Sequence, residues 1–154
     1  MAMHTWFECK IRYEKVMENG MQKKVTEPYL VDALSFTEAE ARIIEEMTPF
    51  ISGEFTVSDI KRANYSELFP SDEESADRWF KCKLIFITLD EKSGAEKKTS
   101  TQVLVQAADL RDAVKKLDEG MKGTMADYQI GMVSETPLMD VYPYSAGPND
   151  KPEF

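Results

Sequence analysis

The amino-acid sequence predicts an α+β fold built as a tandem duplication of one β-β-α-β unit, and three observations favour this prediction. Segments return after 73 or 74 residues: residues 6–11 (WFECKI) return as residues 79–84 (WFKCKL), and residues 30–33 (LVDA) return as residues 104–107 (LVQA). Within each copy, residues first alternate with the period of a strand and then follow the period of a helix. Antiparallel strands covered by one helix are typical of α+β proteins. We expect the two sheets, each covered by its helix, to pack as a pseudo-twofold pair.

The repeat also predicts where the copies begin and end. We place the first copy at residues 1–70 and the second at residues 79–144, joined by an acidic linker over residues 71–78. Residues 145–154 are rich in Gly, Pro, Asn and charge, and we expect a flexible tail there. Each copy is close to the length at which an isolated core becomes marginal, which favours packing of one copy on the other.

The first strand is predicted from its alternation and has two distinct sides. The apolar side comprises Phe7, Cys9, Ile11 and Tyr13, and the mixed side comprises Trp6, Glu8, Lys10, Arg12 and Glu14. Asn19-Gly20 predicts a hairpin turn, after which a return strand covers residues 24–33. Pro28 cannot donate a ladder hydrogen bond, so this strand is predicted to lie at a sheet edge or to be bulged.

A helix and a third strand complete the first copy. Ser35 and Glu38 form the S-x-x-E pattern of a capping box, and Pro49 ends the helix. Its apolar stripe comprises Phe36, Ala39, Ile43 and Met47. The third strand is expected over residues 54–62, followed by a short extended segment that ends at Pro70.

The second copy repeats this plan with few changes. Asp109 replaces Ser35 as the helix cap, and residues 128–133 match the third strand of the first copy. The helix stripe becomes Leu110, Ala113, Leu117 and Met121.

Composition limits the classes of protein to which the chain can belong. A net charge of −9 argues against binding duplex DNA over the whole surface. No run approaches the roughly 18 apolar residues of a membrane helix, and the first residues lack a signal-peptide pattern, so we expect a cytoplasmic protein without membrane contact. Cys9 and Cys82 occupy the same position in the two copies and are expected to be buried thiols. A disulfide between them is the alternative, which a reducing compartment disfavours.

Two segments of the first copy resemble a known family. Residues 6–13 (WFECKIRY) and 26–40 (TEPYLVDALSFTEAE) are similar to a small family of bacterial and phage proteins, known only as a domain of unknown function. The resemblance covers most of the chain. It implies no catalytic residues and no cofactor, and it favours an accessory protein of a phage or mobile element.

The sequence shows no pattern typical of an enzyme. His4 is the only histidine, and with two cysteines it cannot complete a four-ligand zinc site. A phosphate-binding loop and a nucleophile elbow are both absent from the sequence. We therefore predict no catalysis, no metal and no cofactor. An enzyme with an unfamiliar site stays the third possibility and requires a deep pocket lined by matching residues of both copies.

The mixed sides of the two first strands predict a non-enzymatic, single-stranded nucleic-acid-binding protein. Aromatic and cationic residues alternate there: Trp6, Lys10 and Arg12 in the first copy, and Trp79, Lys81 and Lys83 in the second. Bases would stack on the indoles for about 1–3 kcal/mol each while the cations contact phosphates. Lys23-Lys24 and Lys97-Lys98 add positive charge to the paired strands. The alternative is that both indoles are buried where the halves meet.

A protein–protein interaction module is the alternative function. The acidic helix face, with Glu38, Glu45 and Glu46, could meet a basic partner, or mimic DNA and inhibit a host or replication protein. Phe154 ends a tail that is similar to the acidic, Phe-terminated tips by which bacterial and phage single-strand-binding proteins recruit replication partners. Phe154 is therefore the candidate partner-binding residue.

Overall fold

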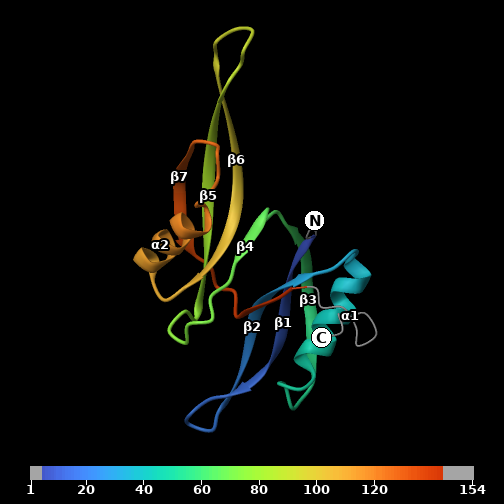
Figure 1. The fold of residues 1–154 in the computed structure, drawn as a ribbon. Coiled ribbons are helices and arrows are strands. Elements are labelled where there is room, and N and C mark those ends of the chain that lie inside the picture. The colour runs from blue at the N-terminus through green and yellow to red at the C-terminus, as the bar shows by residue number, and fades with distance from the viewer. Residues whose placement is uncertain (1–4, 144–154) are drawn as a thin grey trace, which may run out of the picture. The chain divides into compact units, whose positions relative to one another are not determined.

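The computed structural model describes residues 5–143, and this part of the chain is an α+β protein with two four-stranded sheets and two helices (Figure 1). It divides into two units. Among the described residues, unit 1 contains residues 5–63 and 138–143, and unit 2 contains residues 64–137. Phe154 and His4 lie outside the described residues.

The sheet of unit 1 combines three strands from the start of the chain with one from its end. The strand order is β3-β1-β2-β8, and α1 (Phe36–Met47) packs on one face. The strands are β1 (Trp6–Val16), β2 (Gln22–Asp32), β3 (Phe55–Ala63) and β8 (Asp140–Tyr142). β1 is antiparallel to β2 and β3, whereas the short β8 is parallel to β2.

Unit 2 has the same arrangement. Its strand order is β4-β6-β5-β7, with β5 antiparallel to both neighbours, β4 parallel to β6, and α2 (Leu110–Gly120) packed on one face. The strands are β4 (Glu67–Phe69), β5 (Arg78–Leu89), β6 (Glu96–Ala107) and β7 (Tyr128–Glu135).

The bounds of the units differ from those of the predicted repeats because two short strands join the other sheet. β4 follows β3 in the chain and lies within the predicted first copy, yet it pairs with β6 of unit 2. β8 follows β7 and lies within the predicted second copy, yet it pairs with β2 of unit 1. The chain therefore passes from one unit to the other twice.

Both helices begin at the predicted caps. The backbone N–H of Glu38 donates to Ser35 Oγ at 3.1 Å, and the backbone N–H of Asp112 donates to Asp109 Oδ1 at 2.8 Å. Each cap satisfies an N–H group that has no partner within the helix.

One core lies under each helix. The core of unit 1 comprises Phe7, Cys9, Ile11, Val31, Ala33, Ala39, Ile43 and Met47. The core of unit 2 comprises Phe80, Cys82, Leu84, Val103, Val105, Ala107, Ala113, Leu117 and Met121. The alternation of the first strands is thus confirmed, and so are three of the four predicted stripe residues of each helix. Phe36 and Leu110, the first residues of the two helices, are instead 50% and 51% exposed.

The two cysteines are free and buried, as the sequence predicts. Burial raises the pKa of the Cys9 thiol to about 12 and that of the Cys82 thiol to about 11. Both thiols therefore stay protonated at neutral pH and act as small apolar core groups.

The predicted position of Pro28 at a sheet edge is wrong. β2 lies between β1 and β8, so it is an inner strand. Pro28 fits because the ladder with β8 begins one residue later, at Tyr29, and the Pro28 carbonyl accepts a hydrogen bond from the Met139 N–H at 2.9 Å. The bulges lie instead on the outer strands β3 and β7, opposite Lys10/Ile11 and Lys83/Leu84.

Candidate functional site

Both predicted stacking residues are buried. Trp6 is 1% exposed and Trp79 is 5% exposed, so the prediction that both indoles face solvent is wrong. The alternation of a strand identifies the face on which a side chain lies, but it does not reveal what covers that face. Indole has a large apolar area, and burying it is favourable by roughly 25 cal/mol per Å². Neither ring is available to stack on a base in this structure.

The four predicted phosphate-binding cations are distributed over the two units. Lys10 and Arg12 lie on the face of the unit 1 sheet away from α1, and Lys81 and Lys83 lie on the corresponding face of unit 2. Arg12 is exposed, whereas the three lysines are half-buried. The structure thus forms two pairs of cations, one in each unit.

The predicted acidic face of α1 is only partly exposed. Glu45 is exposed on this helix, but Glu38 and Glu46 are half-buried. Glu38 also supplies the N–H group that the Ser35 cap satisfies. A basic partner would therefore find one fully accessible carboxylate among the three that were predicted.

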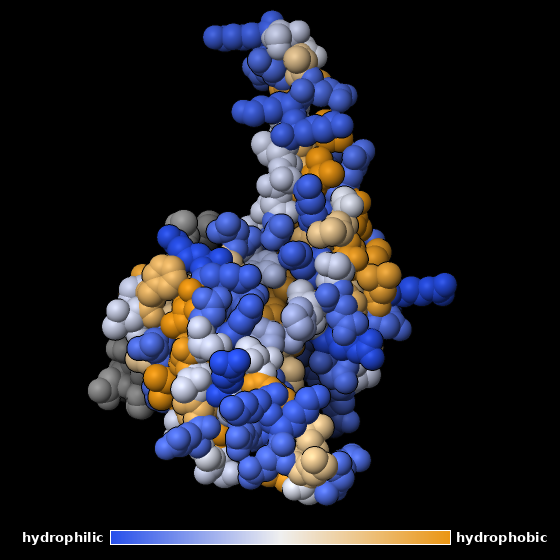
Figure 2. All heavy atoms as spheres, turned by 180° about the vertical axis from the view of Figure 1, so that it is seen from behind, coloured by the Kyte–Doolittle hydropathy of each residue, from blue (hydrophilic) through white to orange (hydrophobic). Residues whose placement is uncertain are grey.

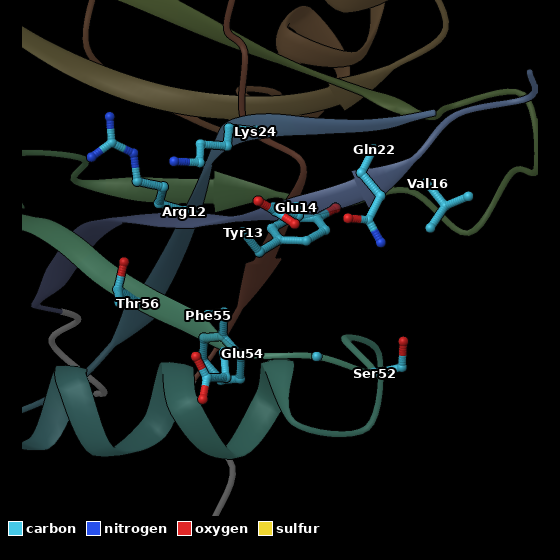
Figure 3. A pocket seen from close by; sticks show the side chains of 11 residues that line it. Arg12, Tyr13, Glu14, Val16, Gln22, Lys24, Ser52, Glu54, Phe55 and Thr56 are labelled. Atoms are coloured by element: carbon cyan, nitrogen blue, oxygen red, sulfur yellow. The ribbon is translucent and has the colours of Figure 1, made fainter. Parts of the chain in front are cut away.

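A groove opens in unit 1 beside the end of the β1–β2 hairpin (Figure 3). Its volume is about 700 Å³, within the range of ligand pockets. Arg12 and Lys24 form one end of it, the Tyr13 ring lies near its centre, and Phe55 lies across from that ring (Figure 3). The remaining lining residues are Glu14, Val16, Gln22, Ser52, Gly53, Glu54 and Thr56.

A half-buried carboxylate holds Tyr13 in place. The Tyr13 hydroxyl donates to Glu27 Oε1 at 2.7 Å, and the Tyr29 hydroxyl approaches the same atom at 3.4 Å. Lys15 Nζ lies 3.6 Å from Glu27 Oε2, and the Glu27 side chain is only 12% exposed. We call Tyr13, Glu27, Tyr29 and Tyr142 the tyrosine cluster; the rings of Tyr29 and Tyr142 stack with centroids 6.2 Å apart.

The phenols of this cluster are hard to ionise. Burial, then the hydrogen bond to Glu27, raises the pKa of Tyr13 to about 12. Burial, then the charge of Asp140, raises the pKa of Tyr142 to about 12. Burial, then the charge of Glu27, also raises the pKa of Tyr29. The three hydroxyls therefore remain neutral donors near neutral pH.

Unit 2 exposes apolar side chains where unit 1 has its groove. Ile85, Ile87 and Leu89 lie on the face of β5 away from α2, and Met132 lies on the same face of β7. Leu89 is 69% exposed and Met132 is 41% exposed, while the two isoleucines are half-buried. We call these four residues the apolar strip. Figure 2 shows apolar atoms running along the end of the β5–β6 hairpin.

Gly131 makes room for the strip. It is the extra residue of the β7 bulge, and a Cβ atom at this position would lie 2.9 Å from Ile85 Cδ1. Cations flank the strip on the same face, because Lys98 is opposite Ile87 and Lys83 precedes Ile85 by two residues. The strip thus combines exposed apolar surface with local positive charge.

Sequence reasoning missed the groove and the strip for different reasons. The groove depends on Tyr13 meeting Phe55 across two strands, which no local pattern reveals. The strip lies on the side of β5 that the sequence predicts as mixed. The earlier residues of this strand alternate between apolar and polar types, and this pattern drew attention away from the apolar residues that follow on the mixed side. Within residues 5–143, no group of three or more His, Cys, Asp or Glu side chains is placed to hold a metal ion. In the same range, no helix is long and apolar enough to cross a membrane.

These features define a small α+β protein with a groove in unit 1 and an exposed apolar strip in unit 2, and comparison places it in a family. Residues 5–144 match the domain of unknown function DUF4494, so the chain belongs to that family. No curated protein and no solved structure matches the chain.

Proposed function

We propose that this protein is a non-enzymatic protein-interaction module that binds its partner through the apolar strip of unit 2. The exposure of Leu89 and Met132 beside the two isoleucines is the observation that carries the proposal. Contiguous exposed apolar surface is uncommon on monomeric proteins and often marks an interaction site. Single exposed apolar residues would not support this conclusion, but two exposed and two half-buried apolar residues on one face of adjacent strands do.

The size and charge of the strip indicate what binds there. From Ile85 to Leu89 it extends about 13 Å, at about 3.3 Å per residue, which matches about two turns of an α-helix. Lys83 and Lys98 flank it on the same face. We therefore propose an amphipathic partner segment whose apolar side covers the strip and whose acidic residues meet these lysines.

Selection of displayed 12-residue random peptides on the immobilised full-length protein tests the proposal. We expect enriched peptides with apolar residues at helical spacing and flanking Asp or Glu. L89D should weaken their binding at least about tenfold, because it places a charge in the contact. Val16 is the matched control: it ends β1 as Leu89 ends β5, and it is 65% exposed. V16D should bind like the unaltered protein.

The same experiment can overturn the proposal. If enriched peptides bind L89D and the unaltered protein equally, the strip is not the site. If E45K abolishes binding while L89D does not, the acidic face of α1 binds the partner.

Single-stranded nucleic-acid binding is a second proposal, which the row of Lys81, Lys83 and Lys98 on one face of unit 2 favours. It lacks stacking groups now that the indoles are known to be buried. Titration of labelled oligonucleotides at low and high salt tests it, because phosphate contacts weaken as salt rises. Absence of binding at low salt would remove it.

We also propose that the two units arose by tandem duplication. Three features support this origin: the equivalent strand order of the two sheets, the β-bulges at corresponding positions, and the helix caps at Ser35 and Asp109. The pseudo-twofold packing, the cytoplasmic location, the phage or mobile-element origin and the partner role of Phe154 stay predictions.

A further inference from the structure

We infer that the apolar strip of unit 2 binds α1 of a second copy of this chain. The inference rests on the proposed function, because it names the amphipathic segment that covers the strip. It predicts a heterologous interface, in which a surface of unit 1 on one copy meets a different surface of unit 2 on the next. Three features support it: exposed apolar side chains on α1, their spacing, and acidic residues beside them.

One side of α1 exposes apolar groups. Phe36 is 50% exposed and Ile44 is 41% exposed. They are eight positions apart in the helix, with the exposed Glu40 midway between them. Residues four positions apart are neighbours on a helix surface, so the three side chains follow one another along one side. We call Phe36, Glu40 and Ile44 the α1 flank.

Both apolar residues of the α1 flank are held in position. The Phe36 ring meets the ring of buried Phe7 edge to face, with centroids 4.9 Å apart, although half of Phe36 remains exposed. The Ile44 carbonyl accepts hydrogen bonds from the Thr48 N–H at 3.0 Å and from Thr48 Oγ1 at 2.6 Å, which close the last turn of the helix. Because these groups are already ordered, a partner that covers them loses less entropy on binding.

The α1 flank matches the apolar strip in length. From Phe36 to Ile44 the helix rises about 12 Å, at about 1.5 Å per residue. The strip extends about 13 Å from Ile85 to Leu89, at about 3.3 Å per residue. Each surface therefore offers apolar groups over the same span, and the contact can cover both surfaces along their whole length.

The two surfaces also carry opposite charges. Glu40 lies within the α1 flank and Glu45 follows Ile44, whereas Lys83 and Lys98 flank the strip. Within residues 5–143, none of these four charged side chains forms an ion pair. Opposite charges favour the encounter of the flank with the strip, whereas contact between two strips would bring lysines together. The charges thus favour α1 over a second strip as the occupant.

Each unit has one of the two surfaces and lacks the other. In α2, Asp118 stands where α1 has Ile44, nine residues after the cap in both helices, and it accepts a hydrogen bond from the Tyr128 hydroxyl at 3.1 Å. In β1, Arg12 stands where β5 has Ile85, directly beyond the bulge in both units. Contact between the unlike surfaces therefore joins unit 1 of one copy to unit 2 of another and continues into rings or open chains.

Sedimentation velocity of the full chain from about 1 µM to about 1 mM tests the inference. We expect the average mass to rise with concentration beyond that of a dimer, because each copy in a dimer keeps one surface free. L89D and I44D should each weaken association at least about tenfold, since each places a charge in an apolar contact. The helix scaffold accommodates the second change, because α2 has Asp118 at the same position.

An equimolar mixture of the two variants gives the sharpest result. L89D keeps the α1 flank and I44D keeps the strip, so the mixture should form dimers and grow no further. V16D and L110D are the matched controls, because Val16 ends β1 as Leu89 ends β5 and Leu110 begins α2 as Phe36 begins α1. Both controls should associate like the unaltered protein.

Three results would overturn the inference. The first is a chain that stays monomeric over this range; if the displayed peptides still bind the strip, the proposed function stands without the inference. The second is association that L89D or I44D leaves unchanged. The third is a mixture that stays monomeric although each variant alone has lost association, which indicates contact between like surfaces.

Thermal unfolding checks that the variants keep their fold, which we expect because every altered side chain is exposed. If I44D unfolds at a lower temperature than the unaltered protein, E40K takes its place. It reverses a charge at an exposed position of the α1 flank and should weaken association in the same way. Association that E40K leaves unchanged would then count against the inference.

Discussion

At the end of its first hairpin, unit 1 carries Arg12 and Glu14 on the sheet face away from the helix, where unit 2 carries Ile85 and Ile87. The opposite face differs in the same sense. Unit 1 has the tyrosine cluster around Glu27 there, whereas unit 2 has apolar Phe86, Val103 and Phe69. Unit 1 therefore carries polar groups on both faces of its hairpin end, whereas unit 2 carries apolar groups at the matching positions of both faces.

The scaffolds under these hairpins remain alike, even where residue types differ. Arg42 of α1 donates hydrogen bonds to the carbonyls of Asp32 and Pro143. Lys116, the corresponding cation of α2, donates to Ser71 Oγ at 3.0 Å and to Glu73 Oε2 at 3.2 Å. In each unit, a helix cation thus fixes the segment that follows the short parallel strand. Because the scaffold is shared, we infer that the hairpin ends are where the two units differ in function.

The largest effect is expected from removing the indoles, and it tests whether the two scaffolds are equivalent. Trp6→Ala and Trp79→Ala should each lower the free energy of unfolding by about 3–5 kcal/mol, because each leaves a large cavity in a buried site. Urea unfolding followed by circular dichroism measures the loss. L89A should change stability by only about 0.5 kcal/mol, since that side chain is exposed. A loss below about 1 kcal/mol for one tryptophan would show that the units do not use their indoles alike.

Titration of the tyrosines sharpens the comparison at the hairpin ends. The folded pKa of Tyr13 and of Tyr142 is raised from 10.0 to about 12, and that of Tyr29 is raised as well. A raised pKa contributes stability that is fully present below pH 10 and is lost as the pH rises through about 12. We therefore expect tyrosinate absorbance of this cluster to appear only above pH 10 in an alkaline titration. The protein should lose stability between pH 10 and about pH 12.

Single Tyr→Phe variants identify which tyrosine gives the tyrosinate absorbance that appears at high pH. Y13F should remove one late-titrating phenol from unit 1, and Y128F is the comparison in unit 2, where a hydrogen bond to Asp118 accompanies a raised pKa. If the phenols of the folded protein all titrate at their ordinary pKa, the Glu27 network does not hold Tyr13 as described.

The sequence was sufficient to predict the local parts of this fold. Alternation identified the first strands, and the Ser35 and Asp109 caps identified both helix starts, because these signals lie within a few residues of one another. The paths of β4 and β8 could not be predicted, since three-residue strands carry no periodic pattern. The burial of Trp6 was undecidable for a related reason: alternation does not identify what covers a face. Of the groove, only Arg12 and Lys24 were noticed as cations, because their partners are brought together by pairing distant strands.

The smallest effect concerns the caps, where the units use different residues for one task. Ser35→Ala and Asp109→Ala should each cost about 1 kcal/mol, because each leaves a helix N–H without its acceptor. D109N separates the hydrogen bond from the charge: it keeps an acceptor oxygen and removes only the attraction to the helix dipole, about 0.3–1 kcal/mol. Added salt should shrink the D109N loss and leave the S35A loss unchanged, because only the first is a charge effect. A salt-dependent loss for S35A would contradict this division and would mean that the two caps are not equivalent.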